Sequence, residues 1–193
     1  MNINRAATTF RPSAQRRRAQ SVLVLTGVIC ALSMTAAHAE LQLTFKEGAP
    51  KDRFSIVNVG DCVLGASVME IDLAGSAAGL IFDTTGRGAG VDVFQPFDVV
   101  RGAAHLAETS RPLDGDTVVR LVLTELAPGD EIVFTIDVDD TLQSSELGQI
   151  RVSGAEIAGA SVRLSEGNKP MVEAAFTSSA TVDLPAPVCR PSS

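Results

Sequence analysis

Hydrophobic and polar residues alternate through residues 117–138 in the pattern of two β-strands. In the second half of this stretch Phe134 and Ile136 alternate with polar residues, which predicts a strand with one buried face. The first half alternates in the same way. Pro128 and Gly129 lie between the halves and suit the two central positions of a type II turn. We therefore predict that the two strands form a hairpin, around which the rest of the chain is organised.

Further short strands are predicted on both sides of this hairpin. Each is an apolar or alternating run bounded by turn-forming residues, and they lie at residues 41–45, 53–59, 66–73, 80–82, 91–94, 97–100, 149–152, 160–164 and 171–182. Residues 103–108 have the one helix-like pattern. Roughly eight to ten short strands with turn signals between them predict an all-β fold, a single antiparallel β-sandwich of the immunoglobulin-like, Greek-key type.

The start of the chain has the pattern of an export signal. Three arginines at 16–18 precede an apolar run at 22–32, and residues 37–39 form an A-x-A cleavage site. The apolar run is too short to span a membrane. The arginine pair leaves twin-arginine export open beside general secretion, and either route predicts a periplasmic or extracellular protein.

These boundaries divide the chain into three parts. We expect a signal peptide at 1–39, one β-sandwich domain at 40–184 and a proline-rich tail at 185–193. The 154 residues that follow the cleavage site are enough for one domain with a substantial core. No membrane span is expected after signal cleavage.

Removal of the signal makes the protein more acidic. All 23 acidic residues follow residue 39, so the mature chain carries 11 basic residues and a formal net charge of −12. This charge disfavours nucleic acids and anionic membranes as partners and favours divalent cations or basic partners. Solubility alone also explains the acidity. The absence of Trp and Tyr further weakens carbohydrate and nucleic-acid binding, because few rings are left for stacking.

Two cysteines remain after cleavage, Cys62 and Cys189. In an exported chain such a pair predicts a disulfide, here one that ties the C-terminal tail back to the domain. Closing a loop of this length stabilises the fold by roughly 4–5 kcal/mol on the loop-entropy account. Two free thiols are the alternative.

The clearest candidate for chemistry is the acidic run at 137–141, which follows an apolar strand. It matches D-x-D-x-T, the first motif of haloacid-dehalogenase-type phosphotransferases, but no helical pattern and no later pair of aspartates accompany it. Clustered carboxylates at the end of a strand also suit Ca²⁺, which prefers hard oxygen ligands. We expect a Ca²⁺ site formed by Asp137, Asp139 and Asp140, with a solvated acidic strand end as the alternative.

Other motifs give weaker indications of a binding or catalytic role. Asp114 and Asp116 are further acidic candidates that the sequence does not place. The glycine-rich stretch at 86–90 has neither the lysine nor the following helix of a phosphate-binding loop, so we interpret it as an ordinary loop. No catalytic residues and no certain cofactor are predicted.

Several stretches resemble known groups of bacterial proteins. Residues 54–73 resemble the opening of immunoglobulin-like adhesion modules of bacterial surface proteins. The stretches KEGAPKDRF, DLAGSAAGLIFD, GAGVDVFQPF, FTIDVDDTL and VSGAEIAGA are similar to bacterial exported proteins labelled aggregation factor core. This resemblance covers most of the mature chain and implies an extracellular adhesion or matrix role, assisted by calcium, with no catalytic residues.

Two function classes follow. The first is an exported, non-enzymatic structural or interaction module with a protein or cell-surface partner, assisted by Ca²⁺ in adhesion or aggregation. The second is an exported hydrolase that uses paired carboxylates, such as Asp83 with Asp92 or Asp137 with Asp139. A glycoside hydrolase needs such a pair beside a cleft with sugar-stacking rings, and the lack of Trp and Tyr favours the first class.

Overall fold

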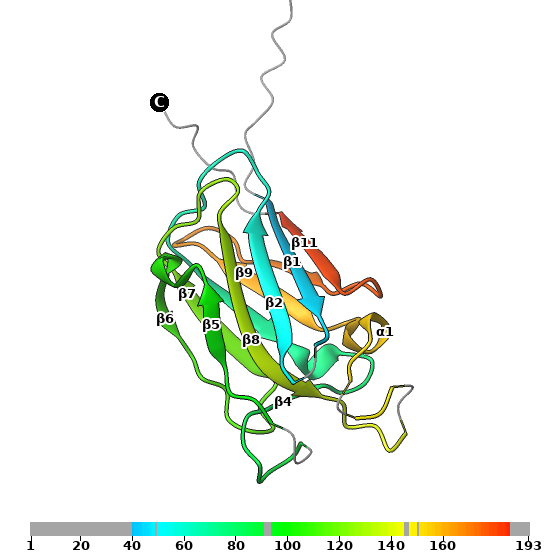
Figure 1. Ribbon diagram of the computed structural model, residues 1–193. Helices are drawn as coiled ribbons and strands as arrows, with labels where there is room; N and C mark the ends of the chain where they lie inside the picture. Colours follow the sequence, from blue (N-terminus) through cyan, green and yellow to red (C-terminus); the bar gives the residue numbers. More distant parts are fainter. Residues whose placement is uncertain (1–39, 49, 91–93, 145–146, 150, 186–193) are drawn as a thin grey trace, which may run out of the picture. The chain divides into compact units, whose positions relative to one another are not determined.

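A computed structural model describes residues 40–48, 50–90, 94–144, 147–149 and 151–185. In this part of the chain eleven strands form two antiparallel sheets that pack together around one hydrophobic core (Figure 1). The predicted all-β antiparallel sandwich is therefore confirmed, with one strand more than the expected eight to ten. The immunoglobulin-like Greek-key topology stays a prediction.

The first sheet has the strand order β11-β1-β2-β8-β4, and β5 also pairs with β8. Its strands are β1 (Glu40–Lys46), β2 (Asp52–Asn58), β4 (Ile81–Asp83), β5 (Asp98–Arg101), β8 (Glu131–Asp139) and β11 (Thr181–Pro185). The second sheet has the order β10-β9-β3-β7-β6. Its strands are β3 (Ser67–Asp72), β6 (Leu106–Thr109), β7 (Val118–Leu123), β9 (Ser161–Ser165) and β10 (Val172–Ala175).

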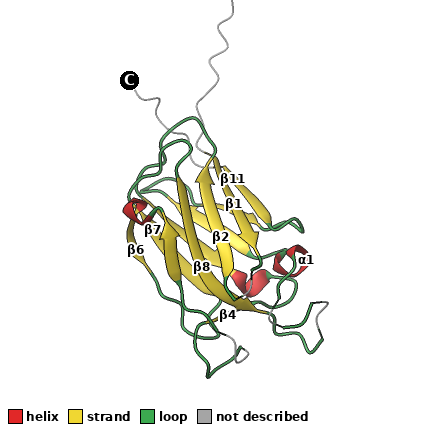
Figure 2. Ribbon diagram, viewed as in Figure 1, coloured by secondary structure: helices red, strands yellow, loops and turns green. Residues whose placement is uncertain are grey.

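In the described part of the chain three short helical turns lie between the strands. Figure 2 draws them in red. They are the 3₁₀ turns η1 (Leu73–Gly75) and η2 (Ala103–His105) and the α-helix α1 (Gly154–Ile157). The helix begins with a capping box, because Ser153 accepts the N–H of Glu156 while the Glu156 carboxylate accepts the N–H of Ser153.

Alternation of residues along β1, β2 and β8 supplies the aromatic centre of the core. Phe54 on β2 stacks on Phe134 on β8, with ring centroids 4.9 Å apart. Phe45 and Phe176 pack against the same Phe54 ring at 5.1 and 6.3 Å. Such ring pairs contribute about 0.5–1.5 kcal/mol each beyond the burial of their apolar area.

The predicted hairpin at 117–138 is wrong in its pairing, although both of its strands exist. β7 belongs to the second sheet and β8 to the first, so the connection crosses the sandwich from one sheet to the other. The predicted turn is correct, because Asp130 N–H donates to the carbonyl of Ala127 and Gly129 has φ of 81°. Leu126, buried in the core and bridged to Leu64, holds the connection between the sheets.

Two other local predictions are corrected. The helix-like residues 103–108 form only the three-residue turn η2 and then continue as β6, which pairs with β7. No strand forms at the described residues of 149–152, which lead into α1. Most of the strand predicted at 91–94 lies outside the described residues.

The export and disulfide predictions concern segments that the structure does not describe. The signal peptide at 1–39 and most of the tail at 185–193 lie outside the described residues. Cys62 is buried, but Cys189 lies in that tail, so the Cys62–Cys189 pairing stays a prediction. Among the described residues, no helix has the length and apolar character needed to cross a membrane.

Candidate functional site

The acidic run predicted to bind Ca²⁺ lies at the C-terminal end of β8 and is buried. Asp137 is 5% exposed, Asp139 0% and Asp140 3%. The alternative of a solvated strand end is therefore wrong. Two other segments pack against this end of β8, because Asp137 N–H donates to the carbonyl of Gln95 and Asp140 N–H donates to that of Gln149.

Pairing of β4 with β8 brings a further buried aspartate to the same place. Asp83 lies directly opposite Asp137, and Ile81 lies opposite Asp139. The Asp83 side chain is 0% exposed and its carboxyl lies against those of Asp114 and Asp139. Among the described residues no N–H or O–H group donates to either carboxylate oxygen of Asp83. We call Asp83, Asp114, Asp137 and Asp139 the acidic cluster.

Asp114 joins the cluster from the turn before β7 and organises the glycine-rich loop. Its Oδ1 accepts the N–H groups of Thr84 and Thr85, at 3.0 and 3.2 Å, and its Oδ2 accepts that of Ala89 at 2.7 Å. The loop that resembles a phosphate cradle therefore holds an anion of the protein itself, the Asp114 carboxylate.

Two glycines allow the loop to approach the carboxylates closely. A Cβ atom at Gly88 would collide with the Asp114 carboxylate, and one at Gly90 would collide with the Asp83 side chain. Any larger residue at either position would force the loop or the aspartate side chain to shift. The loop at 84–90 is thus fitted to the cluster through Asp114 and through these two contacts.

A fifth carboxyl, Asp52, lies where β2 begins beside the end of β8. It is 3% exposed and accepts the N–H groups of Gly48 and Val138, at 3.1 and 3.0 Å. Burial raises the pKa of Asp52 to about 8, and the nearby Asp137 adds to the rise, while these two N–H donors oppose it.

Burial and mutual repulsion also raise pKa values inside the cluster. Burial, followed by the carboxyls of Asp114 and Asp139, raises the pKa of Asp83 to about 7. Burial and then the charge of Asp139 raise the pKa of Asp137 to about 7. The pKa of Asp114 is lowered although burial opposes this, because Asp83 and the loop N–H groups favour its charged form.

The negative charge of the acidic cluster can be neutralised in two ways. Carboxyls in contact share a proton at low pH, or their oxygens surround a cation when they are ionised. In the part of the chain that the structure describes, no group of three or more Asp, Glu, His or Cys side chains is already arranged to hold a metal ion. A cation at the acidic cluster would therefore need its side chains to adjust.

The structure brings together two of the three predicted Ca²⁺ ligands. Asp139 contacts Asp83 and interacts with Asp137, whereas Asp140 uses its Oδ1 to accept the N–H of Leu142 at 2.9 Å, as the residue that begins a turn. The sequence suggested Asp83 and Asp114 as candidates without placing them. Asp52, at the first position of a strand, carries no sequence signal of its role.

Of the two carboxylate pairs of the hydrolase alternative, the structure describes only one completely. Asp137 and Asp139 lie near each other, but Asp92 lies outside the described residues. The cavity of about 440 Å³ on the first sheet is not lined by any member of the acidic cluster. β8 is antiparallel to β2, β4 and β5, which differs from the parallel strand that carries the D-x-D-x-T motif of the phosphotransferases.

Comparison of the chain with known protein families, with curated proteins and with solved structures found no match.

Proposed function

We propose that this chain is an exported β-sandwich module that binds Ca²⁺ at the acidic cluster and has a structural or interaction role rather than a catalytic one. One observation carries the proposal. Asp83 is fully buried, neither of its oxygens receives a hydrogen bond among the described residues, and its neighbours are two further carboxyls. A buried carboxylate that receives no hydrogen bond costs free energy, and binding a proton or a cation removes this cost.

The donor set favours Ca²⁺ over other cations. Asp83, Asp114 and Asp139 offer only carboxylate oxygens, the hard ligands that Ca²⁺ and Mg²⁺ take. Ca²⁺ accepts six to eight oxygens in flexible geometry, whereas Mg²⁺ demands a near-ideal octahedron. Side chains that must adjust around the ion therefore suit Ca²⁺ better, at the weak affinities of extracellular modules, with dissociation constants of about 10⁻⁴–10⁻³ M.

Binding at this place would join three separate segments of the chain. Asp83 ends β4, Asp139 ends β8, and Asp114 holds the loop at 84–90 through three N–H groups. A cation among them would fix this loop against both strands. In this proposal Ca²⁺ stiffens one end of the sandwich, which then contacts a protein or cell-surface partner in adhesion or aggregation.

Calcium titration calorimetry tests the binding step. The protein is exported from its full-length gene, purified and freed of metal, and then titrated with Ca²⁺ and separately with Mg²⁺ at pH 8. We expect saturable Ca²⁺ binding in the 0.1–1 mM range, about that of extracellular modules, and weaker Mg²⁺ binding. Asp83→Asn and Asp139→Asn should each weaken Ca²⁺ binding at least tenfold.

The matched control is Asp183→Asn, which removes an exposed carboxylate on β11 that accepts a hydrogen bond from Gln42. This variant should bind Ca²⁺ as the unaltered protein does. Absence of saturable binding at 10 mM Ca²⁺, or equal binding by Asp83→Asn, would overturn the proposed site. Calcium-dependent clustering of beads coated with the protein tests the interaction role separately.

A further inference from the structure

A row of polar side chains crosses the first sheet and includes Thr135, which lies two residues before Asp137 on β8. Lys46 on β1 lies directly opposite Arg53 on β2, Arg53 lies opposite Thr135 on β8, and Thr135 lies opposite Asp98 on β5. Like charges directly opposite each other destabilise a strand pair. Two adjacent cations at one end of such a row therefore need an anion nearby.

The described part of the chain supplies little negative charge to these two cations. Neither Lys46 nor Arg53 forms an ion pair with any described carboxylate. The Glu131 carboxylate interacts electrostatically with Arg53. It already accepts hydrogen bonds from Ser55 Oγ and from Arg101, both at 2.6 Å. Its carboxylate is thus committed to other donors.

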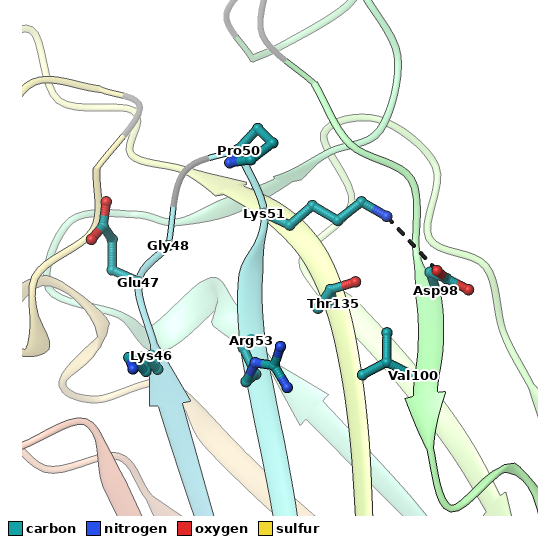
Figure 3. A pocket seen from close by; sticks show the side chains of 9 residues that line it. All are labelled: Lys46, Glu47, Gly48, Pro50, Lys51, Arg53, Asp98, Val100 and Thr135. Atoms are coloured by element: carbon teal, nitrogen blue, oxygen red, sulfur yellow. Dashed lines mark ion pairs between the residues drawn. The ribbon is translucent and has the colours of Figure 1, made fainter.

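The cations border a cavity of about 440 Å³, drawn in Figure 3. Lys46, Lys51 and Arg53 line it together with two acids, Glu47 and Asp98. Both acids have other partners, because Glu47 pairs with Arg151 at 2.9 Å and Asp98 pairs with Lys51 at 3.9 Å. The cavity lining therefore carries an excess of positive charge although the whole protein is acidic.

Thr135 provides a second, independent indication of a ligand. It lines the same cavity, its side chain is only 6% exposed, and its Oγ1 has no hydrogen-bond partner among the described residues. A buried hydroxyl without a partner costs about 1–3 kcal/mol. The oxygen itself is buried, so a ligand oxygen in the cavity would accept its hydrogen bond after the Thr135 side chain rotates toward the cavity.

From this geometry we propose that the cavity binds the oxyanion of a small molecule, a carboxylate, phosphate or sulfate group. Arg53 and Lys46 supply the positive charge, and the Thr135 hydroxyl donates a hydrogen bond. The guanidinium of Arg53 can bind such a group through two parallel N–H donors. No member of the acidic cluster lines this cavity, and the charge of its proposed ligand is opposite to that of Ca²⁺.

Titration calorimetry at constant ionic strength tests the inference, with metal-free protein purified after export. Inorganic phosphate, sulfate and glucuronate are the three probes. We expect saturable binding of at least one of them, with affinity reduced at least tenfold in Arg53→Gln and in Lys46→Gln. Thr135→Val, which keeps the side-chain shape and removes the hydroxyl, should weaken binding about tenfold, as the loss of one hydrogen bond of roughly 1.4 kcal/mol predicts.

Arg120→Gln is the matched control, because it removes an exposed cation from β7 of the other sheet. This variant should retain full binding. Tighter binding of glucuronate would identify the ligand as a carboxylate, and tighter binding of phosphate or sulfate would identify a tetrahedral oxyanion. No saturable binding of any probe, or equal losses in Arg53→Gln and Arg120→Gln, would overturn the inference.

Discussion

Asp83 and Asp137 lie directly opposite each other where β4 pairs with β8, and both side chains are buried. Two like charges at opposed positions destabilise a strand pair, and burial adds to that cost. The pKa of each carboxyl is raised to about 7, first by burial and then by neighbouring carboxyls, which are Asp114 and Asp139 for Asp83 and Asp139 for Asp137. The protein therefore folds most favourably when these groups are neutralised.

The first prediction is that stability in the absence of metal falls as the pH rises. Asp52, Asp83 and Asp137 have pKa values of about 8, 7 and 7 in the folded protein and an ordinary value of 3.8. Between these limits the folded state binds more protons than the unfolded state, so the free energy of unfolding decreases with pH. Urea unfolding at pH 5, 6, 7 and 8 in EDTA should show this decrease.

A reduced charge on the whole chain also favours folding at lower pH, so a variant must separate the two effects. Asp52→Asn should flatten the dependence throughout the range from pH 5 to pH 8, because the Asp52 carboxyl holds its extra proton in the folded state over most of that range, whereas Asp183→Asn should leave the slope unchanged. Stability that increases from pH 5 to pH 8 in EDTA would contradict the raised pKa values.

Asp83→Asn should stabilise the metal-free protein at pH 8. The substitution keeps the shape of the side chain and removes a buried charge that receives no hydrogen bond among the described residues. We expect a gain on the order of 1 kcal/mol, since an amide costs less to bury than a carboxylate, which corresponds to about 2–4 °C in melting temperature. Thermal melting in EDTA measures this gain, and a large loss of stability would show that the Asp83 charge is structurally required.

Phe54→Ala should destabilise the sandwich by about 3–5 kcal/mol, because it leaves a cavity at the centre of the aromatic core. Phe54 contacts the rings of Phe45, Phe134 and Phe176. Urea unfolding measures the loss. Leu113→Ala removes a side chain that is 73% exposed and serves as the control, with an expected change within about 0.5 kcal/mol.

Cys62→Ser tests the predicted disulfide with Cys189. Loss of a cross-link over more than 100 residues should destabilise the protein by roughly 4–5 kcal/mol. The comparison is made by thermal melting under non-reducing conditions, with mass spectrometry of the unaltered protein to detect the linked peptides. An unchanged melting temperature would exclude a stabilising disulfide.

The strands were predictable because alternation is a local property of the sequence. Phe134 and Ile136 alternate with polar residues whichever sheet contains them, so the pattern identifies β8 but not its neighbours. The hairpin was predicted wrongly because alternation does not show which strands pair. Leu126 was the sequence signal against a hairpin, because it is an apolar residue inside the connection. In the structure it is buried and bridged to Leu64, which holds the connection between the two sheets.

The acidic cluster was only half predictable for the same physical reason. Asp137 and Asp139 share a face because they are two residues apart on one strand. Asp83 and Asp114 reach them through strand pairing and a turn between distant segments, which no local pattern specifies. Ser153 and Glu156 are a contrasting case, since their capping-box spacing is visible in the sequence and α1 begins there.

The most direct test of the account is the melting temperature of the metal-free protein at pH 8, measured with EDTA and then with 10 mM Ca²⁺. A dissociation constant of about 0.1–1 mM predicts a stabilisation of about 1.4–2.7 kcal/mol, or roughly 3–10 °C. The same Ca²⁺ addition should raise the melting temperature of Asp83→Asn by about half as much or less, because its affinity for Ca²⁺ is expected to be at least tenfold weaker. A melting temperature that Ca²⁺ leaves unchanged in the unaltered protein, or raises equally in Asp83→Asn, would contradict a calcium site at the acidic cluster.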